Sequence, residues 1–311
     1  MSYNLCMKQS ITIFGLGRMG GQIARRLTKK GFTVYAWNRS EEPVKEIKKK
    51  KIWATNSIEE AVTKSGKSRI FWIMLPHATV DEFLFGPDHL GKFLKKGDIV
   101  IDGGNSHYKD TIKRGKKMEA KGIHYFDCGT SGGVWGEKGG FAMMIGGPKA
   151  KWKTIEPFMK ALSAGDNYAY LGKSGAGHFT KMVHNGIEYG MMEAIGEGYA
   201  VLKASEFNLD LGAVTRVYQK GSVVRSWLID LVANIYKDEN VEATSGKIDA
   251  TGEGEWTVLA GRELGVDVRV IEQSLQVRRE SVDLKNQDKY SNKIVALLRK
   301  QFGGHKIHSS K

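Results

Sequence analysis

Residues 10–37 read SITIFGLGRMGGQIARRLTKKGFTVYAW, and this stretch decides the fold. It opens with a short β-rich run that ends in the Gly-x-Gly-x-x-Gly sequence of residues 15–20. Residues 22–30 predict a helix closed by Gly31, and residues 32–37 predict a second strand. A glycine-rich turn that follows a strand and opens a helix inside such a β-α-β unit is typical of a dinucleotide-binding site.

Strand and helix patterns alternate through the first half of the chain. Further strands are expected at residues 68–75, 98–102, 124–128 and 141–145. This alternation predicts a parallel sheet that helices cover on both faces. We therefore expect a Rossmann-type, doubly wound α/β domain over residues 1–174.

The second half of the chain has a different pattern. Residues 178–205 and 211–236 carry apolar side chains at helical spacing, and no convincing strand follows residue 177. We therefore expect an all-helical domain over residues 175–311, with a tail beyond the final helix.

The composition is that of a globular protein with a basic surface. The 311 residues are 41% hydrophobic and 26% charged, with a formal net charge of +14, which argues against disorder. No apolar run is long enough to span a bilayer, and the N-terminus lacks the apolar core of a signal peptide, so we expect a cytoplasmic protein without a membrane partner.

Cys6 and Cys128 cannot form a disulfide framework, and no metal-binding motif occurs, so no metal is expected. The charge fits small anions or a solvated lysine-rich surface better than nucleic acid, for which the sequence has no motif.

The glycine-rich turn predicts how a dinucleotide is held. The first glycine permits a tight turn, the second lets the backbone approach a pyrophosphate, and the third lets the helix pack close to the sheet. Asn38-Arg39-Ser40 ends the second strand, where an NAD site usually carries Asp or Glu. Arg39 can pair with a 2′-phosphate to which Asn38 and Ser40 can donate, so we favour NADP; the alternative is an exposed Arg39 in an ordinary NAD site. The residues expected to contact the cofactor are Gly15, Leu16, Gly17, Arg18, Met19, Gly20, Asn38, Arg39, Ser40, Met74, Leu75 and Asn105.

The densest group of chemically active side chains lies in residues 177–189, GHFTKMVHNGIEY. Lys181, His184, Asn185 and Glu188 stand at positions i, i+3, i+4 and i+7, so they share one face of a helix. A lysine acts as a base only where burial or nearby cations lower its pKa, and a glutamate of raised pKa would be the complementary acid. A solvated helix face would show the same spacing, although the apolar residues between these four indicate a packed helix.

Two polar loops follow predicted strands. Residues 102–106 read DGGNS and residues 129–133 read GTSGG. Because ligands bind at the carboxyl ends of strands in such sheets, these loops suit the hydroxyls and carboxylate of a substrate. The alternative for each loop is a purely structural turn.

The chain shares six motifs with one known family: GLGRMG (15–20), DGGNS (102–106), GTSGG (129–133), GHFTKMVHNGIEYG (177–190), GEGEWT (252–257) and RKQFGGH (299–305). On these motifs it resembles the decarboxylating 6-phosphogluconate dehydrogenases of the β-hydroxyacid dehydrogenase superfamily, and in length their short bacterial-type form. The resemblance runs from about residue 10 to residue 305. It implies a helical half that binds substrate and forms oligomers, reduced in size compared with the long form.

The resemblance also implies an activity and residue roles. The reaction is oxidative decarboxylation of 6-phospho-D-gluconate to D-ribulose 5-phosphate and CO2 in the pentose phosphate pathway, with NADP or NAD reduced. Lys181 is the implied general base at the C3 hydroxyl, and Glu188 the implied proton donor to C1 of the product. The implied substrate-binding residues are Asn105, Ser131, Gly132, Gly133, His184, Asn185, Tyr189, Arg278, Arg299 and His305.

The same resemblance points to one difference from the family, at Thr251, and to a second subunit. Longer members carry a phosphate-binding lysine where this chain has Thr251, so phosphate binding is expected to rely more on Arg278, Arg299 and Tyr189. The family's tail, here with Arg299 and His305, reaches a neighbouring subunit, so we expect a homodimer or homotetramer.

Three other interpretations stay open. One is a β-hydroxyacid dehydrogenase that acts on 3-hydroxyisobutyrate-like acids without releasing CO2. Another is an NADP-binding protein that has lost catalysis. The weakest is a basic nucleic-acid binder, whose affinity would depend steeply on salt.

Overall fold

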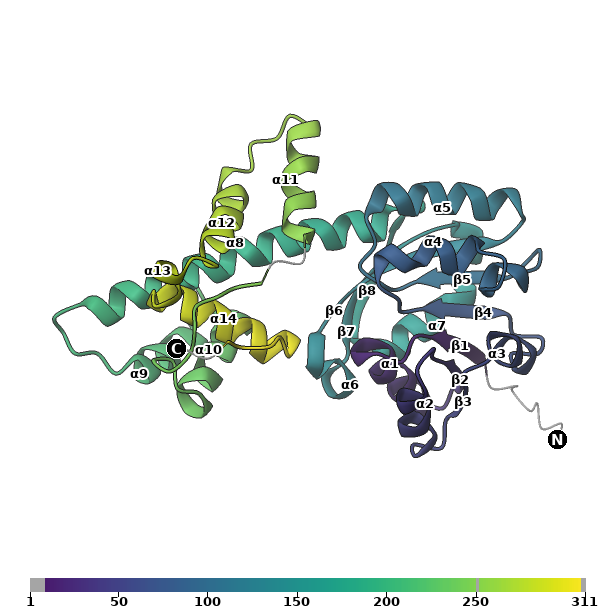
Figure 1. Cartoon of the computed structure of the whole chain (residues 1–311), viewed down its shortest axis with the longest axis horizontal. Helices are drawn as coiled ribbons and strands as arrows, with labels where there is room; N and C mark the ends of the chain where they lie inside the picture. The colour runs from purple at the N-terminus through teal and green to yellow at the C-terminus, as the bar shows by residue number, and fades with distance from the viewer. Residues whose placement is uncertain (1–8, 250–251, 309–311) are drawn as a thin grey trace. The chain divides into compact units, whose positions relative to one another are not determined.

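The computed structural model describes residues 9–249 and 252–308, so Cys6 and Thr251 lie outside the described residues. One sheet of order β3-β2-β1-β4-β5-β6-β7-β8 forms the first half of the chain (Figure 1). Its strands are β1 (Ser10–Phe14), β2 (Thr33–Trp37), β3 (Trp53–Thr55), β4 (Ile70–Ile73), β5 (Ile99–Asp102), β6 (His124–Ser131), β7 (Phe141–Gly146) and β8 (Ser163–Gly172). The six strands expected from the sequence are confirmed, and the two strands at the edges of the sheet, β3 and β8, were not predicted.

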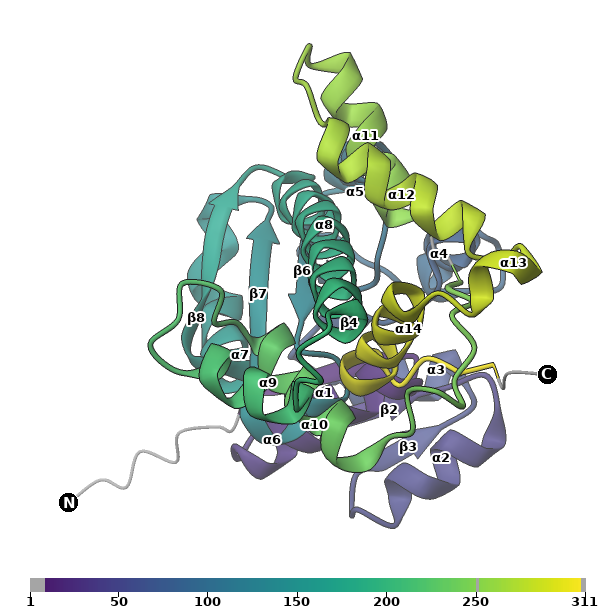
Figure 2. The ribbon, with the colours of Figure 1, turned by 90° about the vertical axis from the view of Figure 1, so that its left-hand side faces the viewer.

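The sheet is parallel from β3 through β6, as predicted, but β7 runs antiparallel to β6. The reason is the short connection at residues 132–140, since a parallel crossover needs a dozen or more residues. The strand that follows, β8, pairs parallel with β7, and Figure 2 shows β6, β7 and β8 side by side.

Helices cover both faces of the sheet, and each face has its own hydrophobic core. On β1, Ile11 and Ile13 belong to one core and Phe14 to the other, as the alternation of side chains in a strand requires. The first core also holds the apolar residues of α1 and α7, and the second holds those of α3 and α4. The helices of this half are α1 (Arg18–Lys29), α2 (Glu41–Lys48), α3 (Ile58–Lys64), α4 (His77–Phe85), α5 (Tyr108–Ala120), α6 (Gly136–Gly139) and α7 (Trp152–Leu162).

In the described chain, only helices follow β8, which confirms the predicted all-helical half. α10 packs against α9 and α14, and α11 packs against α12. The helices are α8 (Ala176–Ala204), α9 (Leu211–Gln219), α10 (Trp227–Asp238), α11 (Glu253–Glu263), α12 (Arg269–Glu280), α13 (Leu284–Gln287) and α14 (Tyr290–Gly303).

Residues 211–236, which carry apolar side chains at helical spacing, form two helices, α9 and α10. The break contains Gly221, which adopts a left-handed conformation with φ of +72°. Ser226 then caps the new helix, since its side chain accepts a hydrogen bond from the Ile229 N–H.

The chain forms two compact units, Met1–Lys181 and Met182–Lys311. The first seven residues of the predicted second domain, 175–181, thus pack with the sheet unit. The domain boundary at residues 174 and 175 stays a prediction. No helix in the described ranges has both the length and the apolar character that a bilayer crossing needs.

Candidate active site

The glycine-rich turn joins β1 to α1 and leaves room for a ligand. A Cβ at Gly15, whose φ is +99°, would lie 2.5 Å from the Met74 carbonyl oxygen, and one at Gly20 would lie 1.9 Å from the Gly15 carbonyl oxygen. A Cβ at Gly17 would meet no atom within 4 Å. Gly15 and Gly20 therefore close the turn, while Gly17 leaves open space before α1. The first turn of α1 carries no acidic residue, so its N–H groups and dipole fit a pyrophosphate.

The end of β2 is braced against this turn. The Leu16 N–H donates to Asn38 Oδ1 at 2.9 Å, and Asn38 Nδ2 donates to the Ser40 carbonyl oxygen at 3.1 Å. Arg39 and Ser40 are exposed, whereas Asn38 is half-buried. Asn38 thus supports the turn, and its two neighbours present their side chains outward beside it.

The loop after β5 packs directly on the end of β4. A Cβ at Gly103 would lie 2.1 Å from Trp72 Nε1, and one at Gly104 would lie 2.7 Å from the Leu75 carbonyl oxygen. Only glycine fits at these two positions without displacing Trp72 of β4 or Leu75, which follows it. The loop therefore holds the exposed Asn105 at the sheet edge to which Met74 and the glycine-rich turn belong.

A buried polar network that the sequence did not reveal supports this loop. Asp102 Oδ2 accepts from Ser106 Oγ at 2.8 Å and from the Tyr125 hydroxyl at 2.9 Å. Arg114 donates to Ser106 Oγ at 3.1 Å and to both carboxylate oxygens of Asp81 at 3.0 and 3.1 Å. Burial raises the pKa of Tyr125 well above its ordinary value, and the hydrogen bond from Arg114 lowers the pKa of Asp81. Arg114 lies within the basic run of α5, so no motif identified it.

The loop after β6 lies against α1. Gln22, a buried residue of α1, donates from Nε2 to the Gly133 carbonyl oxygen at 3.2 Å and accepts from the Glu137 N–H at 2.9 Å. Ser131 ends β6, and Gly132 follows with a φ of +141°, which L side chains rarely adopt. Gln22 thereby links the second polar loop to the helix that begins at the glycine-rich turn.

Lys181 is held against β6 by two features. Asp127 of β6 is fully buried, and its carboxylate accepts from the Gly175 N–H at 2.7 Å and from the His178 N–H at 2.8 Å, at the start of α8. A Cβ at Gly129 would lie 2.3 Å from the Lys181 Cβ, so the stem of this buried lysine rests on the glycine. Asp127 was not among the predicted site residues, although an acid between Phe126 and Cys128 of a predicted buried strand was the available signal.

The second unit holds the other predicted residues of α8. His184 Nδ1 lies 3.2 Å from Asn185 Oδ1 and 3.7 Å from Glu188 Oε2. A Cβ at Gly186 would lie 2.6 Å from Thr257 Cγ2, which explains a glycine inside this helix. The same face of α8 therefore carries an imidazole, an amide and a carboxylate in contact range.

Two predicted arginines are buried in the second unit. Arg278 Nε donates to Glu193 Oε1 at 3.3 Å, and its guanidinium lies 3.3 Å from the centre of the Tyr189 ring. Burial, followed by the nearby Arg278 charge, lowers the pKa of Arg299. The predicted His305 follows α14, and its ring lies 6.2 Å from that of Phe302.

The tail contacts its own chain beyond this point. The Ser245 N–H donates to the His308 carbonyl oxygen at 3.0 Å, and the His308 ring lies 3.4 Å from Asp249 Oδ2. Exchange of the tail between subunits stays a prediction.

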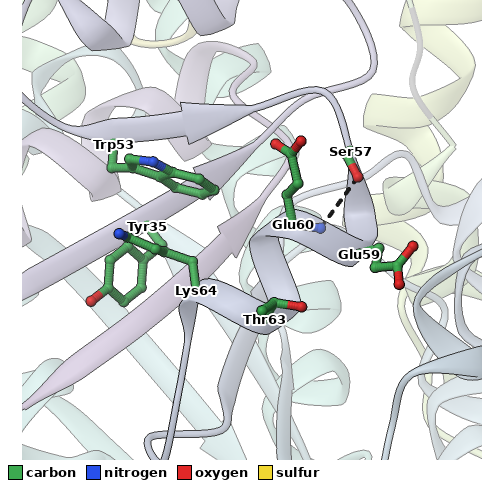
Figure 3. Close-up of a pocket in the computed structure, with 7 residues that line it drawn as sticks. All are labelled: Tyr35, Trp53, Ser57, Glu59, Glu60, Thr63 and Lys64. Carbon is green, nitrogen blue, oxygen red and sulfur yellow. Dashed lines mark hydrogen bonds between the residues drawn. The ribbon is translucent and has the colours of Figure 1, made fainter.

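A separate pocket of about 550 Å³ lies beside β2, β3 and α3 (Figure 3). Its lining includes the edge-to-face pair Tyr35 and Trp53, with the Lys64 ammonium 5.7 Å from the Trp53 ring. None of the predicted site residues lines it. In the described part of the chain, no three His, Cys, Asp or Glu residues group as metal ligands would.

Two family models match the chain. The NAD binding domain of 6-phosphogluconate dehydrogenase matches residues 10–172, and the 6-phosphogluconate dehydrogenase C-terminal domain matches residues 177–309. Together they cover both compact units.

Full-length relatives agree with these matches. YqeC of Bacillus subtilis (strain 168), whose 6-phosphogluconate dehydrogenase name is provisional, is 40% identical over 95% of this chain and 98% of its own length. The NAD(+)-dependent, decarboxylating 6-phosphogluconate dehydrogenase of Haloferax volcanii is 36% identical over 95% of this chain and 97% of its own length. The solved 6-phosphogluconate dehydrogenase of Plasmodium falciparum, described with its cofactor NADP+ and its substrate 6-phosphogluconate, is 30% identical with a TM-score of 0.78. That match covers 88% of this chain, which spans 62% of the Plasmodium chain.

Proposed function

Because the chain belongs to the 6-phosphogluconate dehydrogenase family, we propose that it oxidatively decarboxylates 6-phospho-D-gluconate to D-ribulose 5-phosphate and CO2. NADP+ is the favoured hydride acceptor, on the basis of the exposed Arg39, and NAD+ the other. The observation that carries the proposal is the position of Lys181. Asp127 holds the start of its helix, and the lysine side chain packs on Gly129, at the carboxyl edge of the sheet to which the glycine-rich turn belongs. A general base is needed at this edge, where parallel sheets bind their ligands.

Lys181 takes the role of base and then of acid. It removes the proton of the C3 hydroxyl, while a bound nicotinamide supplies the acceptor for the C3 hydride. The C3 ketone draws electrons from the bond to the carboxyl group, so CO2 leaves and an enediol remains. Protonated Lys181 stabilises the developing oxyanion, and Glu188 donates a proton to the carbon that becomes C1 of the product.

The remaining predicted residues hold the substrate. Its hydroxyls and carboxylate are assigned to residues of two polar loops and of α8, and its phosphate to basic and aromatic residues of the helical unit. We propose Asn105, Ser131, Gly132, Gly133, His184 and Asn185 for the first group and Tyr189, Arg278, Arg299 and His305 for the second. A homodimer or homotetramer with exchanged tails belongs to the same proposal.

One assay tests the reaction. The purified protein is given 6-phosphogluconate with NADP+ and NAD+ in parallel, and reduced cofactor and CO2 are both measured. We expect one CO2 for each reduced cofactor and a higher kcat/KM with NADP+. Reduced cofactor without CO2 would instead support a different β-hydroxyacid dehydrogenase, and no reduced cofactor would support a non-catalytic NADP-binding protein.

A further inference from the structure

Arg278 is buried with four of its five N–H donors unused. Only 1% of the residue is exposed, and its Nε donates to Glu193 Oε1 at 3.3 Å. Among the described residues, neither Nη1 nor Nη2 has a hydrogen-bond partner, although both are buried. A buried guanidinium with two unpaired amino groups is costly. The structure therefore indicates a missing acceptor beside the two terminal amino groups of Arg278.

The surroundings of Arg278 favour an anion as that acceptor. The flat face of the guanidinium stacks on Tyr189, which lies one helical turn before Glu193 on α8. Arg299 of α14 contributes a second buried positive charge, and its own pKa is lowered by burial and by Arg278. The charged groups that face Glu193 are Arg278 from α12, Arg299 from α14 and Glu197 from α8. Two arginines thus meet a single buried carboxylate.

We propose that Glu193 is a positioning residue of the reaction proposed above, on which this inference rests. Glu193 holds Arg278 by Nε, so that the two terminal amino groups face the phosphate of 6-phosphogluconate, and the charge of Glu193 sets how tightly they bind it. Stacking on Tyr189 fixes the plane of the guanidinium, and the bond to Glu193 fixes its rotation within that plane.

The charge of Glu193 changes near neutral pH. Burial raises the pKa of Glu193 to about 7, against the opposing effect of Arg278. A protonated Glu193 still accepts from Nε through its carbonyl oxygen and leaves the full charge of Arg278 to the phosphate. An ionised Glu193 partly neutralises Arg278, so affinity for the phosphate should fall as the pH rises through 7.

Three variants separate the two effects of Glu193, which are the placement of Arg278 and the charge beside it. Glu193→Gln keeps the acceptor without the charge, and Glu193→Leu removes both. Glu197→Gln is the matched control, because it removes one negative charge from an exposed residue one turn further along α8. The Kd values of 6-phosphogluconate and of gluconate, which lacks the phosphate, are measured by calorimetry at about pH 6 and about pH 8, either side of the transition.

Glu193→Gln should bind 6-phosphogluconate like the parent at the lower pH and about threefold to tenfold tighter at the higher pH. Glu193→Leu should bind it about tenfold more weakly at both, the usual scale for a lost charge-assisted contact. Glu197→Gln keeps Glu193 and should therefore retain the parent's fall in affinity between the two pH values, with a transition shifted to lower pH because Glu197 raises the pKa of Glu193. Gluconate should bind all four proteins alike. The substrate's phosphate titrates in every comparison, so it cancels.

Two results would overturn the inference. One is a Glu193→Gln profile that matches the parent at both pH values. The other is a Glu193→Leu protein that binds as tightly as Glu193→Gln. If Glu193→Leu does not fold, the Glu193→Gln profile alone decides. A parent that turns over no 6-phosphogluconate refutes the proposed function, whereas an active parent with an unchanged Glu193→Gln profile refutes this inference alone.

Discussion

Lys181 is the residue whose replacement should reduce activity most. In Lys181→Met the side chain keeps an unbranched stem over Gly129 but loses the base. We expect kcat with 6-phosphogluconate to fall by about 10²–10⁴-fold, the range for loss of a positioned acid-base group. The Kd for NADP+ is measured in parallel and should not change. Unchanged turnover would mean that another group removes the C3 hydroxyl proton.

Gly129 should affect both stability and activity, because the Lys181 side chain packs directly on it. A Cβ there would lie 2.3 Å from the Lys181 Cβ and 3.0 Å from the Gly177 carbonyl oxygen. We expect Gly129→Ala to lower the free energy of unfolding by about 1–3 kcal/mol, as overpacking does, and to reduce kcat. Gly139→Ala is the control, since no atom lies within 4 Å of its added Cβ. Equal stability and kcat in the two variants would show that Lys181 does not depend on this contact.

Arg39 should decide the choice of cofactor. Its side chain is exposed at the end of β2, and no carboxylate precedes α2 at that point. Arg39→Ala should raise the KM for NADP+ by about tenfold, the scale of a lost charge-assisted contact, and leave the KM for NAD+ unchanged. Steady-state rates with both cofactors measure this. A parallel rise for NAD+ would mean that Arg39 contacts something other than the 2′-phosphate.

At the scale of elements, Asp127 joins the end of the sheet to the start of α8. It accepts two backbone N–H groups that would otherwise lack partners at the helix start. Asp127→Ala should lower the free energy of unfolding by about 1–3 kcal/mol. Amide exchange should rise at residues 175–181, and Asp127→Asn, which keeps one acceptor, should fall between the parent and Asp127→Ala. Unchanged exchange in this segment would remove Asp127 as the anchor of α8.

Local patterns explain how much of these elements could be predicted. β1, α1 and β2 were predicted because a strand, a glycine-rich turn and a helix follow one another within residues 10–37. The antiparallel β7 depends on the length of one connection, and β8 carries exposed polar residues that show no buried face. The break between α9 and α10 depends on a left-handed glycine inside an apolar pattern.

The candidate site likewise contains residues that could be predicted from the sequence and residues that could not. The glycine-rich turn and the polar loops lie within contiguous motifs, so their position at the sheet edge could be predicted. Gln22, Arg114 and Asp127 find their partners far along the chain, and spacing gives no sign of such contacts. The catalytic roles of Lys181 and Glu188 came from resemblance and stay predictions.

At the scale of the whole molecule, the net charge of +14 resides at the surface. Of the described Lys and Arg residues, six are buried: Arg26, Arg114, Lys181, Arg278, Lys293 and Arg299. Arg26 and Lys293 donate to carbonyl oxygens, and Arg114 pairs with Asp81, so these three have structural partners. The other three, Lys181, Arg278 and Arg299, are the buried basic residues that the proposed function assigns to the substrate, and Arg278 also pairs with Glu193.

Buried weak acids should make the whole molecule less stable in alkaline solution. Burial raises the pKa of Cys128 to about 12 and that of Tyr125 well above its ordinary value. In the unfolded chain these groups ionise near about pH 8.5 and about pH 10. The folded protein keeps protons that the unfolded chain releases, so the free energy of unfolding should fall above about pH 8.5, by up to about 1.4 kcal/mol per pH unit for each group.

Urea unfolding, followed by tryptophan fluorescence between about pH 8 and about pH 11, measures this slope. Cys128→Ala should flatten it from about pH 8.5 upward, because the buried thiol is then absent from both states. Tyr125→Phe should be less stable at every pH, since Asp102 loses a hydrogen bond, and should flatten the slope only above about pH 10. A Cys128→Ala protein with the parent's slope would mean that the thiol ionises equally in the folded and unfolded chain, which its complete burial in the core opposes.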